Sequence, residues 1–204
     1  MTKVITKNDF YAGFLYAKFW DPVMKNTRAL ISKQVPGRST VIDVASGTGH
    51  QLCSLASRIE RGVGLDLSDR MIRYSENEKS RYGYSNISFE LGDASDLSRF
   101  TNGSFDVSMA TLLFHETPKE KRLPTLLEMK RVSNMVIIAD YTNRASFPGH
   151  LINLMENTIG ISNSHHYKSY KVTGGIPPLL KEAGLALKTY DTAMREMLGI
   201  WSCK

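Results

Sequence analysis

Residues 41–52, with the sequence VIDVASGTGHQL, restrict the fold of this chain more than any other stretch. They read as a short apolar strand, a loop of small residues and the start of a helix. In an α/β sheet, such a unit places a crevice at the carboxyl end of the strand, where these folds bind ligands. Gly47 and Gly49 let a ligand approach the backbone closely, and Asp43 directs a carboxylate into the same crevice. The segment therefore predicts a binding site that suits a ligand with a cationic amine.

Two common ligands of such loops are disfavoured by the residues that follow. The NAD fingerprint requires a third glycine for close packing of helix on strand, and Leu52 occupies that position. A P-loop requires a Gly-Lys-Ser/Thr sequence after the loop, which is not present here. The loop therefore favours an adenosyl ligand without a pyrophosphate.

Apolar, β-prone runs alternate with helical patterns along the middle of the chain. The apolar runs predict strands at 41–44, 62–66, 87–91, 105–110 and 135–140. Helical spacing of apolar residues predicts helices at 51–59, 70–81 and 120–132, with others within 8–34 and near 151–158. Because strands and helices alternate, we expect right-handed βαβ units and a parallel sheet.

The composition of the chain is that of a globular protein. No apolar run approaches the ~20 residues that cross a bilayer, and the N-terminus lacks a secretory pattern, so we expect a cytoplasmic protein. The two cysteines, Cys53 and Cys203, have no metal-ligand spacing and predict free thiols. We expect no metal site.

The net charge of +6 comes from the two ends of the chain, because residues 36–140 are close to neutral. Such an excess favours a solvated surface without a partner, and it leaves open an anionic small-molecule partner or peripheral contact with a membrane surface. No dense Lys/Arg run with interleaved aromatic residues occurs, so nucleic acid is not an expected partner. The sequence leaves the oligomeric state open.

Residues 41–49 resemble the first motif of the class I S-adenosylmethionine-dependent methyltransferases. Ala45 replaces the usual first glycine, as in the quinone-biosynthesis C-methyltransferase-like (methyltransferase type 11) group, which the chain resembles most. Four further segments are similar to family motifs in the same order, namely 62–71 (GVGLDLSDRM), 89–94 (FELGDA), 105–115 (FDVSMATLLFH) and 174–185 (GGIPPLLKEAGL). The resemblance covers roughly residues 10 to 195.

The resemblance implies a three-layer α/β sandwich with a Rossmann-like, seven-stranded, mostly parallel sheet and an antiparallel terminal hairpin at 185–201. Within one domain, 1–204, it implies an N-terminal helical lid (1–35), a cofactor-binding core (36–140), a variable substrate-lid segment (141–172) and the last helix with the hairpin (173–204). The family usually enters its fifth strand through Lys-Pro-Gly-Gly, whereas residues 130–135 read KRVSNM. We therefore expect a shorter connection with Asn134 at positive φ.

The resemblance also implies transfer of a methyl group from S-adenosylmethionine to a small-molecule acceptor, with S-adenosylhomocysteine (SAH) as product. In this interpretation Asp43 lies near the methionine amino group, Asp66 holds the ribose, and Asp93 meets the adenine amine. The alternative for Asp66 and Asp93 is a helix N-cap. The residues expected to contact the cofactor are Asp43, Ala45, Ser46, Gly47, Gly49, Asp66, Leu67, Met71, Gly92, Asp93, Ala94, Ala110, Tyr16 and Arg28.

His115 and Tyr141 follow the fourth and fifth predicted strands and are the candidates for a catalytic base or an acceptor contact. The alternatives are a packed or capping histidine and a core tyrosine. Other functions also stay open, namely methylation of a macromolecule or a lipid headgroup, or non-catalytic binding of an adenosyl ligand. The Asn/Asp-Pro-Pro-Tyr motif of nucleic-acid amino-methylases is not found after the fourth strand, where residues 110–113 read ATLL.

Overall fold

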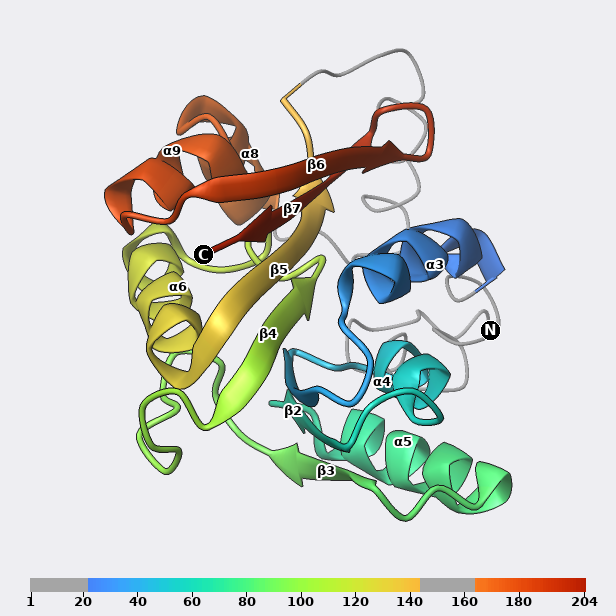
Figure 1. Cartoon of the computed structure of the whole chain (residues 1–204). Coiled ribbons are helices and arrows are strands. Elements are labelled where there is room, and N and C mark those ends of the chain that lie inside the picture. Colours follow the sequence, from blue (N-terminus) through green and yellow to red (C-terminus); the bar gives the residue numbers. More distant parts are fainter. Residues whose placement is uncertain (1–21, 144–163) are drawn as a thin grey trace, which may run out of the picture.

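The computed structural model describes residues 22–143 and 164–204 of the chain. A seven-stranded sheet runs through these residues in the order β3-β2-β1-β4-β5-β7-β6 (Figure 1). Its parallel strands are β1 (Thr40–Val44), β2 (Arg61–Asp66), β3 (Ile87–Leu91), β4 (Phe105–Thr111) and β5 (Ser133–Tyr141). The hairpin of β6 (Leu187–Ala193) and β7 (Leu198–Cys203) adds antiparallel pairing, with β7 inserted between β5 and β6. The predicted seven-stranded, mostly parallel sheet with a terminal hairpin is confirmed.

Helices cover both faces of this sheet and complete three layers (Figure 1). One face carries α3 (Lys25–Gln34), α4 (His50–Leu55) and α5 (Asp69–Tyr82). The opposite face carries α6 (Lys119–Val132), α8 (Ser164–Val172) and α9 (Ile176–Glu182). None of the helices in the described ranges has the length and apolar character needed to cross a membrane.

The central strands are mostly apolar because helices bury both of their faces. Residues Val41 to Val44 of β1 are all buried, and β4 is buried from Val107 to Ala110. The edge strand β6 differs, since its residues from Leu187 to Thr192 are exposed. Continuous apolar runs are typical of such parallel strands, which explains why the sequence predicted them well.

Two glycines on β2 make room for the layer above the sheet. A Cβ at Gly62 would lie 2.7 Å from Cδ1 of Leu52, and a Cβ at Gly64 would lie 2.4 Å from Cδ1 of Phe89. Leu52 occupies the position where a dinucleotide site has its third glycine. The close packing of α4 on the sheet is therefore obtained from the strand side, by Gly62.

The junction between α6 and β5 differs from the expectation. Helix α6 ends at Val132 and β5 begins at Ser133, whose φ of −137° and ψ of 158° are already extended. The prediction of a positive φ at Asn134 is wrong, because Asn134 lies within β5. The Ser133 hydroxyl lies 2.8 Å from the Met129 carbonyl oxygen, so a side chain closes the helix end without a glycine turn.

Other predicted elements differ in extent or lie outside the described residues. Helix α4 ends at Leu55, before the expected residue 59, and α8 was not predicted. The helix expected near 151–158 and the first helix within 8–34 fall outside the described ranges. The division into lid, core and hairpin stays a prediction.

We expect Gly64→Ala to lower the free energy of unfolding by about 1–3 kcal/mol, because the new methyl group overlaps the Phe89 ring. Chemical denaturation of the two proteins measures this difference. Gly37→Ala is the control, since a Cβ there meets nothing closer than 3.9 Å and should change stability by less than about 0.5 kcal/mol. Equal stability of the two variants would contradict the packing described for β2.

Candidate functional site

A cavity of about 470 Å³ opens at the carboxyl edge of the parallel strands. Every parallel strand contributes to its lining, through Gly47 after β1, Asp66 of β2, Asp93 after β3, Thr111 of β4 and Tyr141 of β5. A smaller cavity of about 60 Å³ adjoins it and shares Ala45, Gly47 and Thr111. The site therefore lies where open α/β sheets bind ligands, and its volume suits a small molecule.

The loop after β1 separates the two cavities and has an unusual backbone. Ala45 has a φ of 61°, in the left-handed region where a residue with a Cβ is disfavoured by roughly 1–2 kcal/mol. Gly47 (φ 54°) faces open space, and a Cβ there would meet nothing within 4 Å. Gly49 (φ 75°) is the N-cap of α4, and a Cβ there would lie 2.6 Å from the Phe89 ring. The backbone of Ala45 explains why related loops usually carry glycine at that position.

Asp66 at the end of β2 holds this loop in place. Its Oδ2 accepts a hydrogen bond from the Gly47 amide at 2.8 Å, and its Oδ1 accepts one from the Ser68 amide at 2.8 Å. Burial raises the pKa of Asp66, and the two amide hydrogen bonds oppose that shift. A carboxylate has about four acceptor positions, so Asp66 retains capacity for two hydroxyl donors.

Asp43 lines the smaller cavity together with Arg28 and Ser46. Only 2% of Asp43 is exposed, and burial raises its pKa well above the usual range, with a smaller contribution from the charge of Asp66. Among the described residues, Ser46 Oγ and Thr111 Oγ1 are also buried and have no hydrogen-bond partner. A ligand with a cationic amine and hydrogen-bonding groups would satisfy this set.

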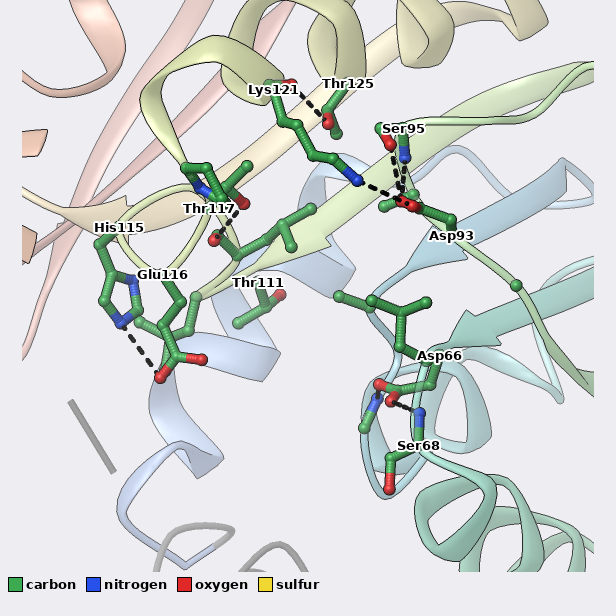
Figure 2. A pocket seen from close by; sticks show the side chains of 18 of the residues that line it. Asp66, Ser68, Asp93, Ser95, Thr111, His115, Glu116, Thr117, Lys121 and Thr125 are labelled. Atoms are coloured by element: carbon green, nitrogen blue, oxygen red, sulfur yellow. Dashed lines mark hydrogen bonds and ion pairs between the residues drawn. The ribbon is translucent and has the colours of Figure 1, made fainter. Parts of the chain in front are cut away.

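Asp93 lies in the turn after β3 and is already paired. Its Oδ1 accepts hydrogen bonds from the Ser95 amide and hydroxyl, both at 2.8 Å. Lys121 reaches from α6 to Asp93 Oδ2 at 3.2 Å (Figure 2). The Ser95 amide is the largest cause of a lowered pKa for Asp93. This arrangement is an Asx turn and not a helix N-cap, because no described residue between Asp93 and α6 is helical. With three donors already bound, the carboxylate retains one acceptor position for an adenine amine.

At the other end of the larger cavity, His115 is hydrogen-bonded to Asp140. His115 Nδ1 lies 2.8 Å from Asp140 Oδ1, and the Asp140 side chain is completely buried. Three backbone amides, those of Phe114, His115 and Tyr141, also donate to this carboxylate. The Tyr141 ring packs edge-on against the imidazole, with ring centres 4.8 Å apart.

Arg122 of α6 joins the His115 loop to α8. The guanidinium is buried and donates to the carbonyl oxygens of Phe114, Thr117 and His166 at 2.7–3.1 Å. Its Cζ lies 5.5 Å from the centre of the Tyr170 ring, and the Tyr170 hydroxyl donates to the Tyr141 carbonyl oxygen at 2.7 Å. Burial lowers the pKa of Arg122 and raises that of Tyr170. Helix α8 is therefore fixed against the loop after β4 and the end of β5, which border the His115 end of the larger cavity.

Most residues predicted for the site line one of the two cavities. The larger cavity contains Ala45, Gly47, Asp66, Leu67, Met71, Gly92, Asp93, Ala94, His115 and Tyr141, and the smaller one contains Arg28, Asp43, Ala45, Ser46 and Gly47. Gly49 and Ala110 line neither cavity, since Gly49 packs against Phe89 and Ala110 is buried within β4. Tyr16 lies outside the described residues.

The sequence interpretation did not identify Asp140, Lys121, Arg122 or Tyr170. Asp140 had a recognisable signal, because it ends the apolar run at 135–140 as Asp66 ends β2. Lys121 and Arg122 look like ordinary helix-surface charges in the sequence, and no pattern indicates that Arg122 is buried.

Comparison with known proteins adds to this picture. Residues 37–184 match the family model described as a methyltransferase domain. Nocamycin O-methyltransferase of Saccharothrix syringae is 35% identical over 107 residues, which are 50% of this chain and 37% of that protein. The chain is therefore aligned with little more than a third of that relative's length.

Solved structures share the fold at low sequence identity. A complex of the Haloferax volcanii Trm112 methyltransferase activator with a methyltransferase matches with a TM-score of 0.74, at 18% identity, covering 97% of this chain and 96% of that chain. Magnesium protoporphyrin IX methyltransferase of Synechocystis PCC 6803, with bound SAH, matches with a TM-score of 0.62, at 15% identity, covering 89% and 81%. These likenesses show the fold.

We expect Asp43→Asn to raise the free energy of unfolding at neutral pH. Because the pKa of Asp43 is higher in the folded protein, the unfolded chain loses this proton first, and stability falls as the pH rises above about 4. The asparagine removes that loss, so denaturant midpoints should depend less on pH between about 4 and 7. Asp69→Asn, at a mostly exposed position on α5, is the control and should not stabilise the protein. A less stable Asp43→Asn protein at neutral pH would contradict the assignment of an unfavourable buried charge.

Proposed function

This chain belongs to the methyltransferase domain family, and we propose that it transfers a methyl group from S-adenosylmethionine to a small-molecule acceptor. One observation carries the proposal. The buried carboxylate of Asp43, the half-buried carboxylate of Asp66 and the unpartnered hydroxyls of Ser46 and Thr111 converge, within the described residues, on two adjoining cavities at the carboxyl edge of the sheet.

The residues present fit the cofactor part by part. Asp43 would hold the amino group, and Arg28 lies in the same cavity for the methionine carboxylate. Asp66 would accept from the ribose hydroxyls while its amide bonds keep the loop after β1 in place. Leu67 and Met71 offer apolar surface beside Gly92 and Asp93 for the adenine. When bound, S-adenosylmethionine supplies an electrophilic methyl group on a sulfonium.

The acceptor side of the larger cavity is formed by His115, Glu116, Tyr141 and the leucines Leu112 and Leu113. Methyl transfer is an in-line displacement, so these residues contribute by positioning the acceptor and excluding water. His115 is only 6% exposed and Tyr141 only 7%. Because these side chains lie inside a cavity, a small molecule suits the acceptor side better than a macromolecular surface.

The alternatives have weaker support. A protein that only binds an adenosyl ligand would not require a histidine to be hydrogen-bonded to a buried carboxylate at the acceptor side of the cavity. His115 and Asp140 form such a pair here. The Saccharothrix syringae relative is by its name a methyltransferase of nocamycin, which also favours a small-molecule acceptor here.

Calorimetric titration of the purified protein with SAH, beside a titration with NAD, tests the cofactor assignment. We expect SAH to bind in the micromolar range or tighter and NAD not to bind. Binding of NAD alone, or of neither ligand, would overturn the proposed function.

Asp66→Ala should weaken SAH binding by about 2–4 kcal/mol, since the variant loses hydrogen bonds to two ribose hydroxyls. Glu60→Ala is the matched control, because Glu60 is an exposed carboxylate next to the opposite end of β2 and should leave the affinity unchanged. The same calorimetric titration measures both variants. An unchanged affinity for Asp66→Ala would show that this carboxylate does not hold the cofactor.

A further inference from the structure

We propose that His115 and Asp140 form a catalytic dyad that deprotonates an acidic hydroxyl group. The methyl acceptor is then a phenol or an enol, and the product is its O-methyl ether. Asp140 positions His115, and His115 takes the hydroxyl proton. The inference rests on the proposed function for the source of the methyl group, and it specifies the acceptor that the proposed function leaves undetermined.

The surroundings of Asp140 determine which nitrogen of His115 carries the proton. Asp140 Oδ2 accepts from the amides of Phe114 (2.8 Å) and His115 (3.3 Å), and Oδ1 accepts from the amide of Tyr141 (2.7 Å). With N–H donors on both oxygens, the carboxylate acts as an acceptor and pairs with a protonated Nδ1 of His115 at 2.8 Å. In the neutral ring, Nε2 then has the lone pair that a base requires.

The Nε2 side of the His115 ring is directed toward the acceptor side of the larger cavity. Glu116 Oε1 lies 4.0 Å from Nε2, and both His115 and Glu116 line the larger cavity. Figure 2 shows these two side chains together, across the cavity from Asp66 and Asp93. A proton taken up by Nε2 would thus reside between the carboxylates of Asp140 and Glu116, which stabilise an imidazolium.

Three tyrosine rings face the imidazole and restrict its motion. The ring centres of Tyr141, Tyr167 and Tyr170 lie 4.8, 6.1 and 6.4 Å from that of His115, all in edge-on arrangements. The Arg122 guanidinium packs over the buried Tyr170 ring and holds the loop through the carbonyl oxygens of Phe114 and Thr117. The loop, β5 and α8 therefore fix the ring together.

An acidic hydroxyl is the acceptor that this chemistry fits. Imidazole has an ordinary pKa of about 6.5 and a phenol one of about 10, a gap that proton transfer during the reaction can bridge. A neutral amine already presents its lone pair and gains little from a base, whereas an unactivated carbon acid needs a far stronger one. The rings of Tyr141 and His115 and the side chains of Leu112 and Leu113 also suit a flat, apolar acceptor.

The hydroxyl proton moves to Nε2, and an oxygen lone pair forms the new O–CH₃ bond as the S–CH₃ bond breaks. The bonding pair stays on sulfur, so neutral SAH and a methyl ether result, and His115 later releases its proton to solvent.

The experiment measures transfer of labelled methyl from S-adenosylmethionine to phenols, naphthols and cyclic enols, beside amines of matched shape. We expect label in the hydroxyl compounds, as O-methyl ethers. In His115→Asn and Asp140→Asn, kcat/KM for an acceptor that is protonated at the assay pH, such as 4-methylphenol, should fall roughly 100-fold or more. For 4-nitrophenol at a pH where it is largely ionised, the loss should be within about threefold, because no base is needed. His165→Asn, at an exposed position on α8, is the control and should match the unchanged protein.

Affinity for SAH separates the outcomes. Equal losses for both phenols in a variant that still binds SAH would assign His115 a structural role and overturn the inference. Label found only in amines or on carbon, or in none of the hydroxyl compounds although SAH binds, would overturn it as well. If the unchanged protein does not bind SAH, the proposed function itself fails. Should Asp140→Asn lose SAH binding through misfolding, His115→Asn decides alone.

Discussion

Parallel pairing of β1 with both β2 and β4 brings the carboxyl ends of these strands to one edge of the sheet, and the acidic groups there need hydrogen-bond partners. Three of the acids at this edge, Asp140, Asp66 and Asp43, are accommodated differently. Asp140 receives N–H donors on both oxygens, and Asp66 receives two amides while retaining further acceptor capacity. Asp43 is left at a raised pKa by burial. The degree of internal pairing therefore separates an acid fixed by the protein from one that a ligand would complete.

The strands were predictable because their physics is local. A strand buried on both faces is mostly apolar, as β1 is, whereas the edge strand β3 alternates buried and part-buried residues and was predicted at its observed bounds. The end of α4 and the junction of α6 with β5 were not predictable in this way. At that junction a hydroxyl near the Met129 carbonyl oxygen replaces the glycine turn, which depends on tertiary packing around Ser133.

The cofactor side of the site was more visible in the sequence than the acceptor side. Asp43, Asp66 and Asp93 each stand at a strand end next to turn residues, so their positions follow from topology. The contact of His115 with Asp140 joins residues 25 apart on adjacent strand ends and depends on the conformation of the intervening loop. That loop is held by the buried Arg122, whose sequence context resembles an exposed helix face.

The insertion of β7 between β5 and β6 also bears on how the chain acquires its fold. All six residues of β7 are buried, and β7 is synthesised after the other six strands of the described sheet. Until it emerges from the ribosome, β5 presents an unpaired, largely apolar edge to the surroundings. The unpaired edge of β5 therefore makes the nascent chain more exposed to edge-to-edge aggregation than the finished protein.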